Sequence, residues 1–208
     1  MIMKKLAALA LVLVVPSLAM AASGLGPMAT LKQKNGDVDK LLRQKVEKGS
    51  PAEQKQKDDI KKMAAALLDY DELGKRSLAQ HWTKLNPLQQ KEFISTLREL
   101  IERNYVKQLR SNLDYQVQYK GEQVEGEDAT VNTIVKVKSQ GKNSDAEIVY
   151  KMRKIPIGAG PEWRVWDVIT DEVSLVRNYR TQFNKIITEQ GYDALIKKMK
   201  KKLAEQES

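Results

Sequence analysis

Few side chains in this sequence are suited to acid-base or metal chemistry. Histidine, the usual proton carrier near neutral pH, occurs once, at His81 beside Trp82. A catalytic site needs a positioned base together with a nucleophile, an oxyanion site or a metal, and one histidine at a helix end is more typical of a structural or solvated role. The chain has no cysteine, and it lacks the GxSxG, HExxH, CxxC and phosphate-loop patterns. We therefore expect no enzyme, no catalytic residue, no metal ligand and no cofactor.

The charged clusters have ordinary structural explanations. Acidic groups occur at 58–59, 69–72 and 171–172, at expected helix starts or turns, where carboxylates interact favourably with the helix dipole. The lysine run at residues 197–202 is typical of a solvated helix face, although it could touch an anionic surface. Neither pattern predicts a catalytic site.

The stretch VSLVRNYRTQF, residues 173–183, has a different character. Leu175, Tyr179 and Phe183 recur every four residues, and Arg177 and Arg180 lie between them. At helical spacing this arrangement gives one apolar, partly aromatic face and one cationic face. The apolar face either fills a core or lines a binding site, and periodicity alone does not distinguish these alternatives.

The N-terminus has the layout of a secretory signal peptide. Lys4 and Lys5 precede an apolar run at residues 6–15, followed by Pro16 and a stretch of mostly small residues. The run is shorter than the roughly 20 apolar residues of a membrane-spanning helix. We expect residues 1–21 to be removed after Ala21, residues 22–36 to form a flexible leader, and residues 37–205 to form a single domain.

The charge balance limits the possible partners. The formal net charge is +9, and removing residues 1–21, which hold two lysines and no acid, leaves +7. Because the chain is expected to be exported, nucleic acid is an improbable partner. Anionic lipid surfaces and acidic protein patches are better candidates for a basic exported chain.

Four helices are expected before residue 111 and two after residue 173. The first begins at Asp37 and ends before Gly49. The next three are predicted by cap residues followed three positions later by Glu or Gln, a pattern that starts helices: Ser50/Glu53, Asp69/Glu72 and Asn86/Gln89. The last two begin at Ser174, an N-cap residue, and after Gly191.

Between these helices the hydrophobic period changes from helical to alternating. Strands are expected at residues 113–120, 131–137, 147–153 and 163–170, separated by turns, including one at 121–127. In the fourth strand, Trp166 and Val168 are expected on one face and Val165 and Ile169 on the other. Helices and strands segregated along the chain predict an α+β fold: a four-stranded antiparallel meander with helices packed on one face.

Several stretches together resemble the MlaC, or toluene-tolerance, family of periplasmic phospholipid-binding proteins. The stretches are YDELGKRSLAQHWTKLNPLQQKEFISTLRELIERNYVKQL (70–109), IVYKMRK (148–154), WRVWDVITDEVSLVRNYRTQF (163–183) and GYDALIKKMK (191–200). The resemblance extends from about Asp37 to Lys202. At Glu172 the chain departs from it, since the family usually has glycine before Val173.

This resemblance implies a monomeric periplasmic carrier that holds a diacyl phospholipid in an apolar pocket between sheet and helices. It implies transient partners, an outer-membrane lipoprotein/porin complex and an inner-membrane ABC transporter, and a role in outer-membrane lipid asymmetry, with no nucleic acid partner. Arg177 and Arg180 are expected at the rim, near the head group. The expected pocket wall comprises Leu97, Ile101, Tyr105, Tyr115, Val117, Val135, Ile148, Tyr150, Met152, Trp166, Val168, Val176, Tyr179 and Phe183.

Two other interpretations fit the same periodicity. A periplasmic interaction or chaperone protein with a filled core would show identical apolar stripes and would purify without lipid. A small-molecule enzyme on a similar scaffold would require a polar pocket with a perturbed acid or base, which this sequence does not indicate.

Overall fold

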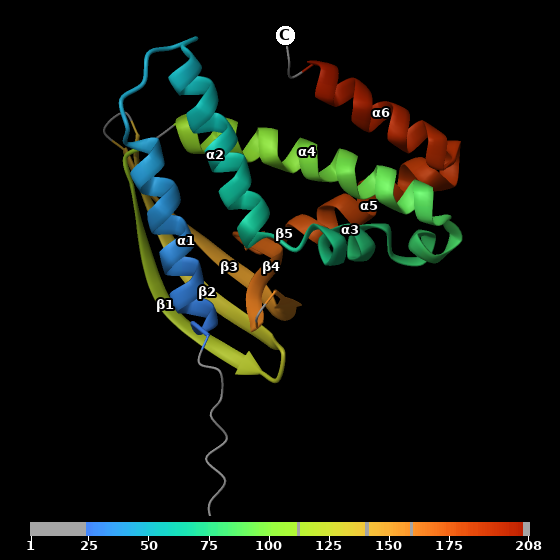
Figure 1. Cartoon of the computed structure of the whole chain (residues 1–208). Coiled ribbons are helices and arrows are strands. Elements are labelled where there is room, and N and C mark those ends of the chain that lie inside the picture. Colours follow the sequence, from blue (N-terminus) through green and yellow to red (C-terminus); the bar gives the residue numbers. More distant parts are fainter. Residues whose placement is uncertain (1–23, 112, 140–141, 159, 206–208) are drawn as a thin grey trace, which may run out of the picture.

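The computed structural model describes residues 24–111, 113–139, 142–158 and 160–205, so the expected signal peptide lies outside the described residues. An antiparallel sheet forms one part of the molecule, α1 lies along its face, and the remaining helices gather beyond one end of the sheet (Figure 1). The helices are α1 (Pro27–Leu42), α2 (Pro51–Leu67), α3 (Tyr70–Leu78), the 3-10 helix η1 (Ala79–Lys84), α4 (Pro87–Ser111), α5 (Leu175–Gln190) and α6 (Tyr192–Glu205).

The predicted helix starts are confirmed by side-chain caps. Ser50 Oγ accepts a hydrogen bond of 3.2 Å from the Glu53 amide at the start of α2. At the start of α4, the Gln89 amide donates to Asn86 Oδ1 over 2.9 Å while the Asn86 amide donates to Gln89 Oε1 over 3.0 Å. These bonds satisfy amides that have no partner within the first turn of a helix.

The expected boundary of the first helix is wrong. Helix α1 begins at Pro27 rather than Asp37, so most of the predicted flexible leader is helical. Proline fits the first position of a helix, and the buried Leu31 and Val38 lie seven residues apart, two turns on the same face. Gly36, in the middle of the helix, lowers helix propensity, but burial of that face outweighs this cost.

The sheet has the order β1-β2-β3-β4-β5, with every neighbouring pair antiparallel. The strands are β1 (Tyr115–Glu125), β2 (Asp128–Ser139), β3 (Lys142–Ile157), β4 (Gly160–Thr170) and β5 (Val173–Ser174). The predicted α+β fold and meander are confirmed, with β5 as a short fifth strand. The expected turn at 121–127 is shorter than predicted, because β1 continues to Glu125.

A bulge in β4 corrects the predicted alternation of that strand. Val168 pairs with Tyr150, and Val165 pairs with Met152, so both valines lie on the same face. Between them the register shifts, and the Trp166 ring packs against the helices instead. The extra residue in the bulge explains why strict alternation fails here.

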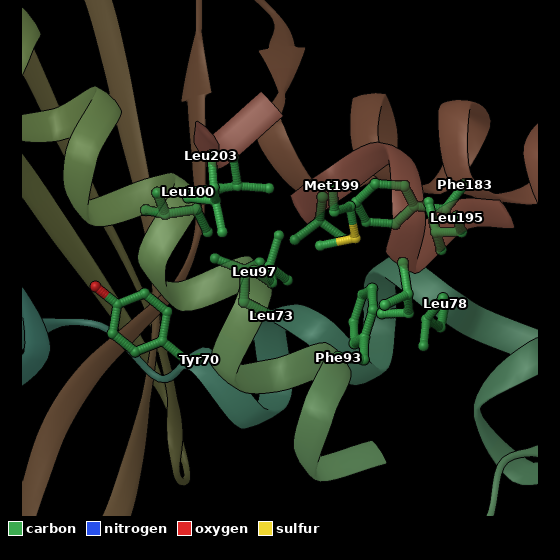
Figure 2. Close-up of a cluster of buried hydrophobic side chains, with 13 residues drawn as sticks. Tyr70, Leu73, Leu78, Phe93, Leu97, Leu100, Phe183, Leu195, Met199 and Leu203 are labelled. Atoms are coloured by element: carbon green, nitrogen blue, oxygen red, sulfur yellow. The ribbon is translucent and has the colours of Figure 1, made fainter. Parts of the chain in front are cut away.

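Buried side chains form three clusters. The first, here called the helical core, joins α3, α4, α5 and α6 (Figure 2), and its buried members are Tyr70, Leu73, Leu78, Phe93, Leu97, Leu100, Ile101, Val176, Phe183, Leu195, Ile196, Met199 and Leu203. The second packs α1 and α2 on one end of the sheet through Leu31, Leu67, Ala129, Val131, Met152, Trp163 and Val165. The third joins α1, α2 and α4 through Val38, Leu42, Ile60 and Val106.

Strand β4 connects the sheet to the helical core. Asp69 donates its backbone amide to the Val165 carbonyl over 2.8 Å, which fixes the start of α3 on the strand. The buried Asp167 accepts from Ser174 Oγ over 2.7 Å and from the Val176 amide over 3.0 Å. One carboxylate thereby holds the N-terminus of α5 against β4, where the helix dipole favours a negative charge.

Candidate functional site

The helix-covered face of the sheet is not uniformly packed. At one end, Val131 and Met152 are completely buried beneath Leu31 of α1. At the other end lie Val117, Val135 and Ile148, which the strand register places on the same face and which we call the aliphatic strip. All three side chains of the strip are only half-buried. A covered face with accessible aliphatic side chains is a feature that a filled core does not require.

Four tyrosines border the aliphatic strip, and we call them the tyrosine group: Tyr105, Tyr115, Tyr119 and Tyr150. Asn35 of α1 donates from Nδ2 to the Tyr119 hydroxyl over 3.0 Å. The carboxylate of Asp39, one turn further along α1, lies beside the Tyr115 hydroxyl. Helix α1 thus brings polar side chains to the same place on the covered face.

The tyrosine group is desolvated although its side chains remain partly accessible. Burial raises the pKa of Tyr105 and of Tyr115 to about 12, and it also raises the pKa of Tyr119 and Tyr150. All four side chains nevertheless keep intermediate exposure. Side chains that are surrounded by protein and still accessible are typical of the lining of an internal space.

The structure divides the predicted pocket wall between different places. Near or within the aliphatic strip and tyrosine group lie Tyr105, Tyr115, Val117, Val135, Ile148 and Tyr150. Met152 and Val168 belong to the packed end of the sheet. The other six pack in or against the helical core: Leu97, Ile101, Trp166, Val176, Tyr179 and Phe183. The apolar stripe of α5 therefore contacts mainly other helices, and its place in a pocket wall stays a prediction.

The two predicted rim arginines are engaged at the helical end of the molecule. Arg177 donates from Nη2 to the backbone carbonyl of Glu172 over 2.9 Å. Arg180 donates from Nε to the carbonyl of Arg76 over 2.9 Å. These bonds tie α5 to the β4–β5 turn and to α3, so the structure does not bring the two arginines to the tyrosine group.

The single histidine also has a structural contact. Its Nε2 lies 2.8 Å from Asn184 Oδ1, which accepts a second bond of 2.7 Å from Gln80 Nε2, and so η1 is held against α5. Within the described part of the chain, no group of three or more His, Cys, Asp or Glu side chains could hold a metal ion. Among the same residues, no helix has the length and apolar character to cross a membrane.

Sequence reasoning missed the contribution of α1 to this site. Asn35, Asp39 and Leu31 all reach the covered face, yet the segment at 27–36 was expected to be a flexible leader. The two-turn spacing of Leu31 and Val38 was the available signal. Tyr119 was recognised as a strand residue, but its place beside Tyr150 depends on the pairing of three strands.

These features define an α+β protein whose antiparallel meander is covered by helices over a half-accessible apolar face. The chain belongs to the MlaC family, since the profile of the family described as MlaC protein matches residues 32–201. The resemblance found in the sequence is thereby confirmed.

Two similar proteins extend this comparison. The intermembrane phospholipid transport system binding protein MlaC of Haemophilus influenzae is 27% identical over 136 residues, which cover 64% of this chain and 63% of that relative. A phospholipid-binding protein from Ralstonia solanacearum, solved in complex with a phospholipid, superposes with a TM-score of 0.70 at 20% identity. That superposition covers 88% of this chain and 99% of the other, and it shows that the two share a fold.

Proposed function

We propose that this protein is a phospholipid carrier that holds acyl chains over the aliphatic strip. The observation that carries the proposal is the half-buried state of Val117, Val135 and Ile148 on a face that helices cover. Aliphatic side chains that face an internal space offer a surface for hydrocarbon. The helical core, by contrast, is packed and serves to hold the helices.

The energetics of such a carrier are set by exchange with a bilayer. At ~0.8 kcal/mol per buried CH₂, two acyl chains of about sixteen carbons represent on the order of 20 kcal/mol relative to water. Nearly all of this free energy is already present in the membrane. The protein therefore has to match the hydrocarbon of the bilayer rather than exceed it, and aliphatic walls are sufficient for this.

The tyrosine group gives the proposed pocket a polar border. A phospholipid has ester and phosphate oxygens that accept hydrogen bonds, and a phenol hydroxyl is a suitable donor. Tyr105 and Tyr150 lie on the covered side of the sheet, so their hydroxyls would meet the glycerol end of a lipid whose chains occupy the strip. A head-group role for Arg177 and Arg180 stays a prediction, since both arginines are bonded elsewhere.

The family relatives support the same function. The Haemophilus influenzae relative is named as a binding protein of intermembrane phospholipid transport, and the Ralstonia solanacearum structure contains a phospholipid. We propose for this chain export by residues 1–21, a periplasmic location and monomeric transport between an outer-membrane lipoprotein/porin complex and an inner-membrane ABC transporter. Its purpose would be to maintain the lipid asymmetry of the outer membrane.

The test compares one filling substitution in the strip with one in the packed end of the same strand. Val135→Trp should occupy the proposed space, abolish uptake of phospholipid by delipidated protein from vesicles, and change the free energy of unfolding by less than about 1 kcal/mol. Val131→Trp should destabilise the fold by about 3 kcal/mol or more, because Val131 is 0% exposed.

Native mass spectrometry of the wild-type protein from the periplasm should show a co-purified phospholipid mass. The proposal is wrong if wild-type protein takes up no phospholipid and Val135→Trp is as destabilising as Val131→Trp. That result would mean that the sheet face is filled, as in an interaction protein without a lipid ligand.

A further inference from the structure

Helix α6 presents a cationic face to solvent. Leu195 and Met199 are buried in the helical core, and the opposite side of the helix exposes Lys197, Lys198 and Lys201. Lys200 and Lys202 are also exposed, on the flanks of that side. The segment Leu175 to Glu205 holds eight basic and three acidic side chains, which is +5 of the formal net charge of +9.

Most of these lysines are not neutralised by neighbours. Among the described residues, no carboxylate lies within ion-pair distance of Lys197 or Lys198. Lys201 approaches Glu205 only to 3.8 Å, and both side chains are more than half exposed. Exposed pairs of this kind contribute little, so the positive potential of the face remains.

Helix α2 shows that lysine-rich helices of this protein can be neutralised. Lys55 and Lys62 both reach the carboxylate of Asp59, at 2.5 and 3.3 Å, and Lys57 lies 3.2 Å from Glu53. Each pair has the i,i+3 or i,i+4 spacing that stabilises a helix. In α6, Lys201 has this spacing to Glu205, but at 3.8 Å, and Lys200 reaches Glu92 of α4 over 2.6 Å. Among the described residues, Lys197 and Lys198 have no such partner, which distinguishes the outer side of α6 from the lysines of α2.

We propose that the exposed side of α6 that carries Lys197, Lys198 and Lys201, here called the α6 lysine face, docks on anionic phospholipid head groups at a bilayer surface. Protein-protein interfaces are enriched in aromatic side chains, methionine and arginine and depleted in lysine. The exposed side of α6 has the opposite composition, and the large exposed hydrophobic side chains of the described residues lie on other elements. Flexible point charges suit a diffuse layer of phosphates better than a shaped protein partner.

This docking is electrostatic and does not involve insertion. The apolar side of α6 is occupied by the helical core, so the helix has no free apolar face to bury among acyl chains. Helix α6 packs against α4 and α5, away from α1 and β1 (Figure 1), so contact through α6 leaves the covered sheet face unobstructed. The lysine side of α6 would contact the surface of the membrane, whereas the aliphatic strip would hold the cargo.

The experiment measures sedimentation of the purified protein with phosphatidylcholine vesicles that do or do not contain about one-third phosphatidylglycerol. Binding is expected only to the anionic vesicles at low salt, and it should disappear at about 0.5 M salt, where charges are screened within a few ångströms. The triple variant Lys197/Lys198/Lys201→Gln should bind on the order of 100-fold more weakly, roughly fivefold for each lysine near the surface.

A matched variant removes the same charge elsewhere. Lys48/Lys55/Lys62→Gln should retain most of the vesicle binding, and both triple variants should keep the wild-type circular dichroism spectrum and uptake of phospholipid at saturation. The proposal is overturned by equal binding to neutral vesicles, by binding that persists in high salt, or by equal losses in the two triple variants. If the wild-type protein binds anionic vesicles but takes up no phospholipid, the proposed carrier function is wrong and the docking proposal stands.

Discussion

The helical core and the aliphatic strip use similar residue types but pack them differently. In the helical core, Phe93 is 0% exposed and meets Phe183 edge to face, with ring centroids 5.6 Å apart. Tyr179 stacks on Phe183, with ring centroids 5.2 Å apart. In the aliphatic strip, Val117 and its register partner Val135 remain half-buried although helices cover their face.

An apolar stripe therefore does not by itself reveal whether it packs a core or lines a binding site. The α5 stripe holds helices together because three other helices present complementary apolar side chains to it. The strip of β1, β2 and β3 is bordered by tyrosines with partly accessible side chains. Stability is therefore expected to depend on the first region and ligand binding on the second.

The largest effect is expected from a substitution that disrupts the helical core. Phe93→Ala removes a completely buried ring and its contact with Phe183, and it should lower the free energy of unfolding by about 4 kcal/mol. Val117→Ala, the paired change in the strip, should cost less than about 1 kcal/mol, because its side chain is already accessible. Urea unfolding of both variants measures this contrast. Equal losses would contradict the distinction between the two regions.

A smaller effect is expected at the connection between the regions. Asp167→Asn replaces one acceptor oxygen by an amide, so either Ser174 Oγ or the Val176 amide loses its partner in a buried site. The cost should be about 2 kcal/mol in urea unfolding. Ser174→Ala, which removes the cap but leaves the carboxylate, should cost about 1 kcal/mol. If Asp167→Asn is the milder change, the carboxylate does not anchor α5.

The pH dependence of stability tests whether the hydroxyl groups of the tyrosine group are shielded from bulk water. Because the folded pKa of Tyr105, about 12, lies above the usual value near 10, the unfolded chain loses this proton first. The contribution of Tyr105 is thus complete below pH 10 and decreases as the pH rises toward 12. Tyr105→Phe should therefore gain about 1 kcal/mol relative to wild type between pH 7 and pH 11, measured by urea unfolding at both values. An unchanged difference would mean that bulk water reaches the hydroxyl.

Much of the architecture could be predicted from local sequence, because local chemistry determines it. Ser50, Asn86 and Ser174 cap the helices they were expected to start. The face shared by Val117 and Val135 follows from the two-residue period of a strand. Whether a face is filled depends instead on the volume of the side chains that other elements contribute. Hydrophobic periodicity carries no information about that volume. The bulge at Trp166 and the contribution of Asn35 are long-range results of this kind.

The smallest effect is expected in the turn between β4 and β5, where Glu172 stands at the position at which the resemblance predicted glycine. Thr170 pairs with Val173, so the two-residue loop between them, Asp171 and Glu172, requires left-handed backbone at both positions. Their φ angles are +46° and +68°. Aspartate tolerates this region better than glutamate, because its short carboxylate can accept a hydrogen bond from nearby backbone, as Asp171 Oδ1 does from the Glu147 amide over 3.1 Å.

Glu172→Gly should therefore raise the free energy of unfolding by about 0.5–1 kcal/mol, since relief of strain exceeds the added entropy of the unfolded chain. The bond from Arg177 Nη2 is unaffected, because it goes to the backbone carbonyl of residue 172. Glu172→Ala keeps the Cβ and should give no gain, which separates backbone strain from loss of the charge. A gain in the alanine variant equal to that in the glycine variant would assign the effect to the carboxylate, and the turn would then be an unstrained connection between the sheet and the helical core.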